Sequence, residues 1–554
     1  MARIFEKYTK GNYENYQDFK ENFSIDAPEK FNFAYDVMDV LAEEQPDKMA
    51  MLWTNVEGEE RSFTFEDFRV LSNQCANFFS SLGIRKGDMV MLILKRRYEF
   101  WISMLALHKI GAVAIPATHL LTKKDIVYRN NYAGVKAIVC ADTANAEHYI
   151  DAAQAESPTL EYKIMVGDLR LPGWISFDEG MQNASAQWQR PVGDADTRLS
   201  DPMLLFFTSG TTGMPKMVMH NYSYALAHIP TAVFWHNVQP DGIHFTVSDT
   251  GWGKCLWGKF YGQWLAETVV FVYDYDKFIP PEMLRVMSKY KITTFCAPPT
   301  IYRYFIKEDL KQYDLSSLRY ATTAGEALNP EVFDQFRAAT GIDIKEAFGQ
   351  TETTMLLGNF TCMKGRKGSL GRPSPLYDVD IVDEQGNSVR AGEVGEICIR
   401  TEKGVPYGMF MEYYRDPERT KEVWHDNIYR TGDLAWKDEE GYYWYVGRAD
   451  DVIKSSGYRI GPFEVESALM EHPAVLETAI TGVPHPERGQ VIKATVVLAA
   501  GYAPSEELKK ELQEHVKRTT APYKYPRIVE FVDELPKTIS GKIRRVEIRK
   551  NDTK

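Results

Sequence analysis

Hydrophobic residues follow two alternating spacings along the first 365 residues of the chain. Residues 87–116, GDMVMLILKRRYEFWISMLALHKIGAVAIP, begin with a continuous apolar run from Met89 to Leu94, as expected for a parallel strand buried on both faces. Apolar residues then recur at helical spacing up to Gly111, and residues 113–115 start a second strand. The segment therefore predicts a complete βαβ unit.

The same order of strands and helices recurs further along the chain. Four more short apolar segments have strand character, at residues 135–139, 268–272, 292–296 and 342–347. Strands that alternate with helices are typical of an α/β fold with parallel sheets. We expect a large domain that contains two doubly wound parallel-sheet subdomains.

The pattern changes after about residue 365. Alternating apolar residues at 379–381 and 397–399 flank a Gly386-Asn387 turn, which predicts an antiparallel hairpin. We expect a small β-barrel-like subdomain at about 365–446.

The last hundred residues have a third pattern of apolar residues, in which amphipathic helices are prominent. Amphipathic helices are predicted near residues 462–471 and 505–519, and a polar turn with two acids, GRADD, precedes them. We place the domain boundary in this turn, which gives a large domain at 1–449 and a small, mobile α+β domain at 450–554.

Composition narrows the class of protein. A chain of 554 residues is too long for one core, and 65 Lys+Arg against 77 Asp+Glu give a net charge of −12, which argues against nucleic-acid or anionic-membrane partners. The six cysteines form no C-x-x-C pair, as in a protein with reduced thiols. The first thirty residues mix acids with bases, which excludes a secretory signal and disfavours a transit peptide, and no apolar run approaches the ~20 residues of a membrane span. We expect a soluble cytoplasmic protein, whether a monomer or a homo-oligomer.

The stretch 204–221, LLFFTSGTTGMPKMVMHN, carries the clearest chemical signal. Glycines allow close approach of the backbone, hydroxyls donate hydrogen bonds and lysine supplies charge, so the loop predicts a polyphosphate ligand. It is not the common P-loop, because Pro215 stands where that pattern needs glycine and Met217 where it needs serine or threonine.

Three further motifs carry candidate chemistry. EAFGQTETT (346–354) ends a predicted strand, which is where open α/β sheets bind nucleotides, and Glu352 has the oxygen ligands that Mg2+ prefers. Asp433 in YRTGDLAW (429–436) can accept hydrogen bonds from ribose hydroxyls. Lys542 lies in a turn of LPKTISGKIRR (535–545). Taken alone, the last two are more simply read as an ordinary turn residue and a solvated basic surface.

The order of these motifs resembles the adenylate-forming superfamily of acyl-CoA synthetases, luciferases and peptide-synthetase adenylation domains. TSGTTGMPK, GEAL, FGQTE, YRTGD, GRADD, GYRI and PKTISGK follow one another through nearly the whole chain. The stretches SDTGW, FGQTET, SSGYRIGPFEVESALMEHPAVLETA and TAPYKYPR are most similar to the medium-chain acyl-CoA synthetases.

The resemblance implies a two-step reaction in which a carboxylic acid attacks the α-phosphate of Mg-ATP, and CoA thiol then attacks the acyl-AMP. Lys542 would stabilise the negative charge that develops in the first step. Glu352 would bind Mg2+. The residues that the resemblance assigns to ATP are Thr208, Ser209, Gly210, Thr211, Thr212, Gly213 and Lys216 at the β- and γ-phosphates, Thr351 at the α-phosphate, Gly325, Glu346, Ala347, Phe348 and Gly349 at the adenine with Gln350 beside them, and Asp433 and Arg448 at the ribose.

The second step would follow a rotation of the small domain about Asp450. The rotation would withdraw Lys542 and bring in the loop at Gly457, with Arg459 near the phosphate of the adenylate. The residues that the resemblance assigns to CoA are Ser456, Gly457, Tyr458, Arg488, Lys517, Tyr525, Pro526 and Arg527. Phe348 stands where the family often has tyrosine, so that any contact from the tyrosine hydroxyl is lost.

The same comparison addresses the acid. Acetate-specific relatives carry tryptophan at the position of Gly349, so glycine predicts a deeper acyl pocket, which Trp252 and Trp257 would still limit. We expect a short-to-medium-chain or branched acid, with a benzoate-type acid as the main rival. Lys254 is expected to extend to solvent rather than to contact the substrate.

Three other classes of protein with this fold are alternatives. A nucleotide-binding regulatory protein would have lost Lys542, Glu352 or the phosphate loop, and all three are present. A peptide-synthetase module would pass its acyl group to a carrier domain, and none follows here. A luciferase-like oxygenase is disfavoured by the CoA-type residues at 455–527.

Overall fold

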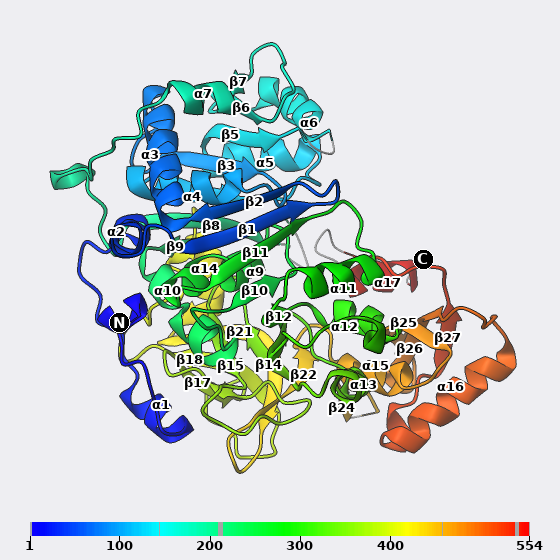
Figure 1. Cartoon of the computed structure of the whole chain (residues 1–554). Helices are drawn as coiled ribbons and strands as arrows, with labels where there is room; N and C mark the ends of the chain where they lie inside the picture. Colours follow the sequence, from blue (N-terminus) through cyan, green and yellow to red (C-terminus); the bar gives the residue numbers. More distant parts are fainter. Residues whose placement is uncertain (1–2, 143–144, 209–213, 457, 538–541, 553–554) are drawn as a thin grey trace.

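The computed structural model describes residues 3–142, 145–208, 214–456, 458–537 and 542–552 (Figure 1). Within these ranges the chain forms four sheets, of nine, eight, five and five strands. The first two are mixed sheets with parallel cores, which confirms the predicted α/β class.

The nine-stranded sheet has a parallel centre and antiparallel edges. Because β13 and β14 are parallel neighbours, their carboxyl ends, at Ala324 and Gly349, lie side by side at the same edge of the sheet. In spatial order the strands are β16 (Arg372–Pro373), β15 (Met355–Gly358), β14 (Ile344–Gly349), β13 (Tyr320–Ala324), β12 (Thr294–Cys296), β10 (Ile243–Thr246), β11 (Val269–Asp274), β1 (Met49–Asn55) and β2 (Glu60–Thr64).

The eight-stranded sheet contains the predicted βαβ unit. β3 and β4 are parallel and are joined by α4 (Glu99–Ile110), which ends where Gly111 adopts a left-handed φ of 84°. In spatial order the strands are β19 (Glu412–Tyr413), β9 (Lys216–Asn221), β8 (Pro202–Thr208), β4 (Val113–Pro116), β3 (Met89–Ile93), β5 (Val135–Ala141), β6 (Tyr162–Val166) and β7 (Ile175–Ser176).

The region predicted as β-barrel-like forms a five-stranded antiparallel sheet. The predicted hairpin is present, with Val379 opposite Ile399 and Ile381 opposite Ile397. The strands are β17 (Asp378–Val382), β18 (Gly395–Arg400), β21 (Ile428–Lys437) and β20 (Trp424–His425), with β22 (Tyr443–Arg448) on β21.

The fourth sheet contains only residues beyond 452. Its strands are β24 (Tyr458–Ile460), β23 (Ile453–Ser455), β26 (Gly489–Leu498) and β25 (Val475–His485), with β27 (Ile528–Phe531) on β26. With α15 (Pro462–Met470), α16 (Glu506–Thr519) and α17 (Arg545–Asp552), these strands enclose separate apolar cores, one of them around Ile453, Val465 and Leu512. In Figure 1 this part, orange to red, projects from the rest of the molecule.

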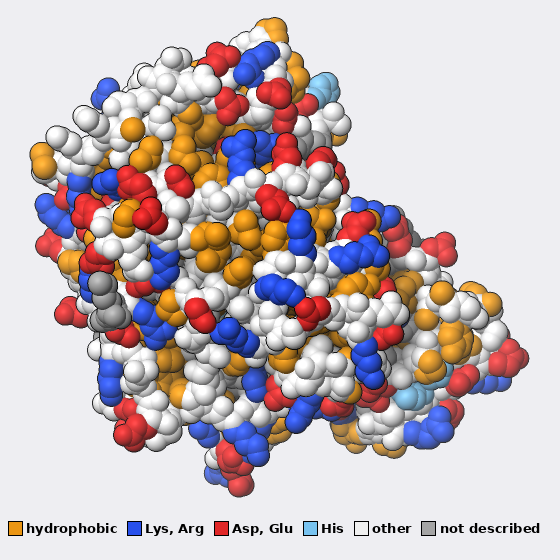
Figure 2. Space-filling view, in the orientation of Figure 1, with side chains coloured by type: hydrophobic (Ala, Val, Ile, Leu, Met, Phe, Trp, Pro, Cys, Tyr) orange, Lys and Arg blue, Asp and Glu red, His pale blue; other side chains and the backbone are white. Residues whose placement is uncertain are grey.

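The remaining α-helices cover the two large sheets or their edges. They are α1 (Tyr16–Asn22), α2 (Val40–Glu44), α3 (Phe65–Ser81), α5 (Lys123–Ala133), α6 (Ala146–Ala153), α7 (Phe177–Asn183), α8 (Ser223–Leu226), α9 (Gly253–Gly258), α10 (Tyr261–Leu265), α11 (Pro280–Lys289), α12 (Pro299–Phe305), α13 (Pro330–Thr340) and α14 (Pro417–Val423). None of the helices in the described ranges has the length and apolarity of a membrane span. Basic and acidic side chains are interspersed over the face shown in Figure 2.

Candidate active site

The two residues predicted for the ribose lie directly opposite each other. Asp433 on β21 and Arg448 on β22 are cross-strand partners, and Arg448 Nη1 lies 3.3 Å from Asp433 Oδ2. Burial raises the pKa of Asp433, and Arg448, the hydrogen bonds of the carboxylate and Lys542 partly offset this rise. The buried carboxylate of Asp433 therefore lies at the edge of the site, beside the guanidinium of Arg448.

Gln350 links this pair to the end of β14. Its side-chain amide donates to Asp433 Oδ2 at 2.6 Å and to the carbonyl of Thr431 at 2.8 Å. The Tyr445 hydroxyl donates to the other carboxylate oxygen of Asp433 at 3.0 Å, and the ring of Tyr445 lies 6.4 Å from that of Phe348. The segments predicted for adenine and ribose are therefore brought together.

The predicted phosphate loop connects two antiparallel strands. Thr208 at the end of β8 is paired with Lys216 at the start of β9. Ser209, Gly210, Thr211, Thr212 and Gly213 lie outside the described residues. Burial lowers the pKa of Lys216, with Glu352 acting in the opposite direction.

Tyr413 is a site residue that the motifs did not indicate. Its hydroxyl donates to Glu352 Oε1 at 2.7 Å, and Lys216 Nζ lies 3.2 Å from that hydroxyl and 4.7 Å from the ring centroid. β19, which carries Tyr413, pairs with β9, which begins at Lys216. Tyr413 thus holds the predicted metal ligand beside the predicted phosphate lysine.

Thr351 is held through its backbone. Nε2 of His220, on β9, donates to the carbonyl of Thr351 at 2.7 Å, and burial lowers the pKa of His220 to about 4. The imidazole is therefore neutral at pH 7 and tethers the turn after β14 to the strand after the phosphate loop.

Glu346 organises the turn after β13. Its carboxyl accepts a hydrogen bond from Leu328 N at 3.0 Å and is 4% exposed, and burial raises its pKa to about 8. Gly325, in the same turn, has a φ of 104°, which other residues rarely adopt. Glu346 therefore fixes the turn that contains Gly325, which is also predicted to contact the adenine.

Replacing Glu346 with glutamine is expected to remove part of the pH dependence of stability. Because the folded pKa of about 8 lies above the ordinary 4.5, the stability that protonation contributes is fully present below pH 4.5 and is lost as pH rises through about 8. The wild type should lose roughly 2–4 kcal/mol relative to Glu346→Gln between about pH 5 and pH 9. Chemical unfolding of both proteins across this range measures the difference, and a difference independent of pH contradicts the assignment.

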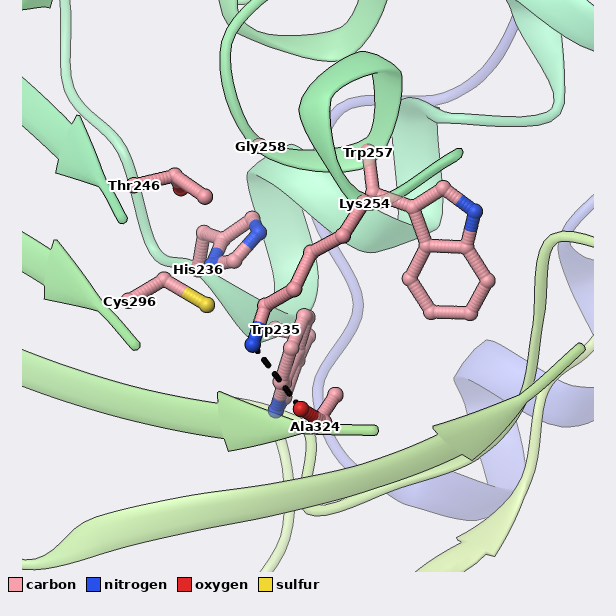
Figure 3. A pocket seen from close by; sticks show the side chains of 8 residues that line it. All are labelled: Trp235, His236, Thr246, Lys254, Trp257, Gly258, Cys296 and Ala324. Atoms are coloured by element: carbon pink, nitrogen blue, oxygen red, sulfur yellow. Dashed lines mark hydrogen bonds between the residues drawn. The ribbon is translucent and has the colours of Figure 1, made fainter. Parts of the chain in front are cut away.

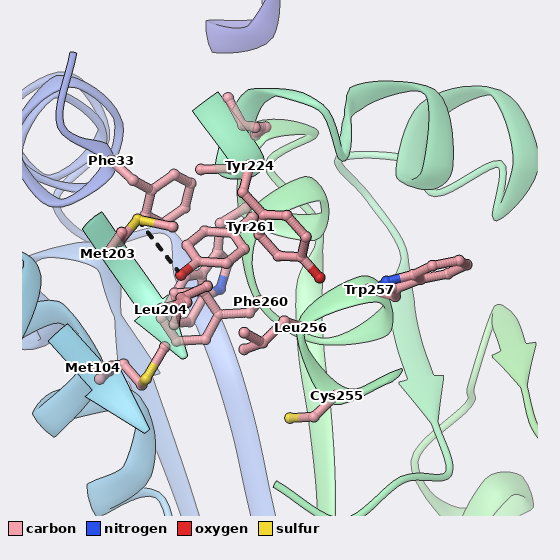
Figure 4. Close-up of a cluster of buried hydrophobic side chains, with 14 of the residues drawn as sticks. Phe33, Met104, Met203, Leu204, Tyr224, Cys255, Leu256, Trp257, Phe260 and Tyr261 are labelled. Atoms are coloured by element: carbon pink, nitrogen blue, oxygen red, sulfur yellow. Dashed lines mark hydrogen bonds between the residues drawn. The ribbon is translucent and has the colours of Figure 1, made fainter. Parts of the chain in front are cut away.

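Gly349 and Trp257, both predicted for the acyl pocket, are in contact. A Cβ added at Gly349 would lie 2.5 Å from the carbonyl oxygen of Thr354 and closer still to the Trp257 indole. Gly349 is not among the residues with positive φ, so close approach, and not backbone conformation, requires glycine. In Figure 4 the Tyr224 hydroxyl is directed toward this indole. Trp257 therefore fills the space over Gly349 that the sequence predicted to be open.

A small cavity of about 10 Å³ lies beside Trp257 (Figure 3). Lys254 points into it and donates to the carbonyl of Ala324 at 2.8 Å. Burial lowers the pKa of Lys254. The expectation that Lys254 extends to solvent is wrong, because the last residue of β13 offers a carbonyl within reach. Trp252, at the start of α9, is half-buried and does not line this cavity.

Lys542, the residue predicted to stabilise the first step, interacts electrostatically with two groups of the large domain. Its side chain is exposed, and it acts electrostatically on both Asp433 and Lys254, favouring the charged form of Asp433 and disfavouring that of Lys254. The charge of Lys542 therefore acts on Asp433, which is predicted for the ribose, and on Lys254, which lies beside the predicted acyl pocket.

The residues predicted for CoA lie on the small domain in two groups. Ser456, with a φ of 51°, donates its backbone N–H to the carbonyl of Arg488 at 2.9 Å. The second group surrounds Tyr525, with Lys517 Nζ 4.4 Å and the Arg527 guanidinium 4.8 Å from its ring centroid and Pro526 beside it. Tyr458 stacks on Tyr523 at 4.1 Å, which connects β24 to the segment of the second group. Gly457 and the side chain of Arg459 lie outside the described part.

Asp450, the predicted hinge, lies between β22 and β23. Its carboxylate is 3.4 Å from Arg448 Nε. An ion pair thus links the predicted hinge to Arg448, one of the two residues predicted for the ribose.

Comparison with known proteins shows similarity to two family models and to curated relatives. Residues 38–414 match the family model of the AMP-binding enzyme, and residues 464–542 match that of the AMP-binding enzyme C-terminal domain. The human mitochondrial acyl-coenzyme A synthetase ACSM3 is 42% identical over 99% of this chain and 94% of its own length. The human mitochondrial ACSM5 is 43% identical over 95% of this chain and 91% of its own length.

A solved structure agrees with these matches. The anthranilate CoA ligase AuaEII, in complex with anthranoyl-AMP, superposes with a TM-score of 0.87 at 29% identity, over 95% of this chain and 98% of that one.

The relatives correct one prediction. The chain was expected to be cytoplasmic, and both human relatives are named as mitochondrial proteins, which contradicts that expectation. Unpaired thiols are typical of every reducing compartment, so they carry no signal that separates the cytoplasm from the others.

The matches span nearly the whole chain, and the predicted nucleotide residues in the described ranges converge on one site. The chain therefore belongs to the AMP-binding, or adenylate-forming, enzyme family, and it is an AMP-forming acid–CoA ligase of the medium-chain acyl-CoA synthetase type.

Proposed function

We propose that this enzyme activates a short-to-medium-chain or branched carboxylic acid with ATP and transfers the acyl group to CoA. The observation that carries the proposal is the convergence of Asp433, Arg448, Gln350 and Glu352 at the carboxyl end of β14. Lys542, on the small domain, acts electrostatically on Asp433 and Lys254 of the large domain. This orientation suits the first half-reaction, in which acid and nucleotide meet.

ATP binding would use the groups that converge at the carboxyl edge of the nine-stranded sheet. Asp433 would accept hydrogen bonds from the ribose hydroxyls, with Arg448 and Gln350 fixing its carboxylate. Lys216 and the loop that precedes it would contact the β- and γ-phosphates, and Thr351 the α-phosphate. The turn at Gly325 and the end of β14 would enclose the adenine.

Glu352 fits the Mg2+ that the family implies. Groups of three or more acidic, histidine or cysteine side chains suited to a metal ion do not occur in the described ranges. A single carboxylate is nevertheless sufficient for Mg2+, which usually completes its shell with phosphate oxygens and water. Glu352 is 9% exposed and accepts from Tyr413 through Oε1, so Tyr413 would fix the carboxylate for the metal. When bound, Mg2+ would neutralise phosphate charge.

The first step is an attack of the carboxylate on the α-phosphate with release of pyrophosphate. Negative charge develops on the α-phosphate oxygens, and Lys542 would stabilise it by a preorganised electrostatic contact, without proton transfer.

The second step would use a different orientation of the small domain. Rotation about Asp450 would withdraw Lys542 and bring in the β23–β24 hairpin, with Arg459 near the adenylate phosphate. Ser456, Gly457, Tyr458 and Arg488 would contact CoA near this hairpin. Lys517, Tyr525, Pro526 and Arg527 would form a basic and aromatic surface for the rest of the molecule.

The limit on the acid comes from Trp257. The indole fills the space over Gly349, so a long straight chain that extends past Gly349 would have to displace it. A compact acid, including a branched one, meets less resistance. A benzoate-type acid is the alternative.

A panel of acids tests the proposal. The purified protein should release AMP only when ATP, Mg2+, CoA and an acid are all present, with a maximum among C3–C8 or branched acids. A maximum at benzoate or anthranilate would assign the aryl alternative instead. The absence of acyl-AMP and acyl-CoA with every acid would leave a nucleotide-binding regulatory protein.

A further inference from the structure

Two adjacent acids, Asp450 and Asp451, pair in opposite directions. Asp450 Oδ1 lies 3.4 Å from Arg448 Nε, at the large-domain site. Asp451 instead pairs with the last helix, α17: its Oδ1 accepts from Arg549 Nη1 at 2.7 Å, and its Oδ2 lies 3.5 Å from Arg545 Nη1. Ion pairs therefore lead from Asp433 through Arg448 to Asp450, and from the next residue, Asp451, to α17.

The residues on either side of Lys542 pair with each other, and we call this pair of segments the base of Lys542. The base is continuous with α17, which begins at Arg545. Lys537 and Ile543, on either side of Lys542, form an antiparallel bridge, and Arg544 N donates to the carbonyl of Pro536 at 2.8 Å. Lys537 Nζ also donates to both carboxylate oxygens of Glu477, at 2.8 and 2.9 Å. The flanks of Lys542 are thus closed on each other and fastened to β25.

Arg545 completes the attachment from the other side. Besides Asp451, its guanidinium donates to Glu466 at 2.6 and 2.8 Å, and Glu466 accepts from Ile480 N at 2.9 Å. The side chain of Asp451 is only 12% exposed and has two arginine partners. Such a pair is screened less by solvent than an exposed ion pair, which contributes little.

We propose that Asp451 is a positioning residue for the first half-reaction. Asp451 directly follows the hinge and binds α17, which is continuous with the base of Lys542. The orientation of the small domain about the hinge therefore also sets the position of the Lys542 ammonium. The inference rests on the proposed role of Lys542. Without Asp451, α17 would keep Glu466 as an anchor and lose its connection to the hinge.

Separate assays of the two half-reactions test this role. Asp451→Asn should slow acid-dependent ATP–pyrophosphate exchange by about 10–100-fold, because a misplacement of about 1 Å can cost that much. Thioester formation from supplied acyl-AMP and CoA should stay within about twofold of wild type, because Lys542 is withdrawn in that step. The matched control is Glu547→Gln, on the same helix, whose carboxylate pairs with Arg544 at 2.9 Å on the exposed face. It should leave both rates unchanged.

Arg549→Gln provides a second route to the same answer. It removes the closer arginine partner of Asp451 and should give the same selective loss, and the double variant should be little worse than Asp451→Asn alone, since contacting partners are not additive. If Asp451→Asn does not fold, as judged by its melting temperature, Arg549→Gln carries the test.

Equal loss in both half-reactions, or no loss in either, would overturn the proposal. Failure of the proposed function looks different: wild type would then lack pyrophosphate exchange, or Lys542→Ala would leave it intact. A wild type that depends on Lys542 but is indifferent to Asp451 would refute the positioning role alone.

Discussion

Replacement of Lys542 with alanine is expected to slow formation of the acyl-adenylate by about 10²–10³-fold, because one preorganised charge at a developing oxyanion is worth ~3–4 kcal/mol. Lys542 already acts on Asp433 and Lys254 in this orientation of the small domain. Thioester formation from supplied acyl-AMP should persist, since the proposed rotation removes Lys542 from the site before CoA attacks.

Single-turnover assays of each half-reaction distinguish these effects. Lys510→Ala, an exposed lysine on α16, is the matched control and should behave as wild type in both assays. A similar decrease in both half-reactions would mean that Lys542 supports the fold or binds nucleotide in both orientations, and the assignment of one orientation to each step would fail.

Replacement of Trp257 with alanine is expected to shift substrate preference toward longer acids. The indole lies against Gly349 and beside the small cavity, so its removal opens space where the acyl chain is proposed to bind. Each buried methylene contributes ~0.8 kcal/mol, so an acid with three more carbons could gain up to ~2.4 kcal/mol, or tens-fold in relative kcat/KM. A C2–C10 series measured on wild type and variant gives this ratio.

Gly349→Ala is the matched comparison. Its Cβ would meet the Thr354 carbonyl, which belongs to the backbone and cannot turn aside, so activity should fall for all acids with their order unchanged. A Trp257→Ala variant that scales all acids equally would show that the indole does not limit chain length.

Local patterns were sufficient to predict the frame of the site. The apolar run at Met89, the helical spacing after it and Gly111 specify a βαβ unit because each depends on residues near in sequence. Asp433 and Arg448 were predicted together from motifs of the family, and strands β21 and β22, joined by a short turn, bring them into register.

Contacts between distant segments could not be read in this way. Tyr413 reaches Glu352 and Lys216 only because β19 adds to the edge of β9, far away in sequence. Lys254 turns inward because the carbonyl of Ala324 faces it, and the Trp257 indole reaches from α9 to Gly349 at the end of β14. In each case the side chain is ordinary for its type, and its role depends on the tertiary neighbour.

The antiparallel pairing of Thr208 with Lys216 has a consequence for how the proposed phosphate site holds its charge. Enzymes with a P-loop follow the loop with a helix, whose dipole places a fixed partial charge of about +0.5 against the phosphates. Here β9 begins at Lys216, so a strand takes the place of that helix. The positive charge at this end of the loop therefore comes from an ammonium group whose pKa burial lowers. A helix dipole keeps its charge at every pH, whereas Lys216 loses its charge as the solution becomes alkaline.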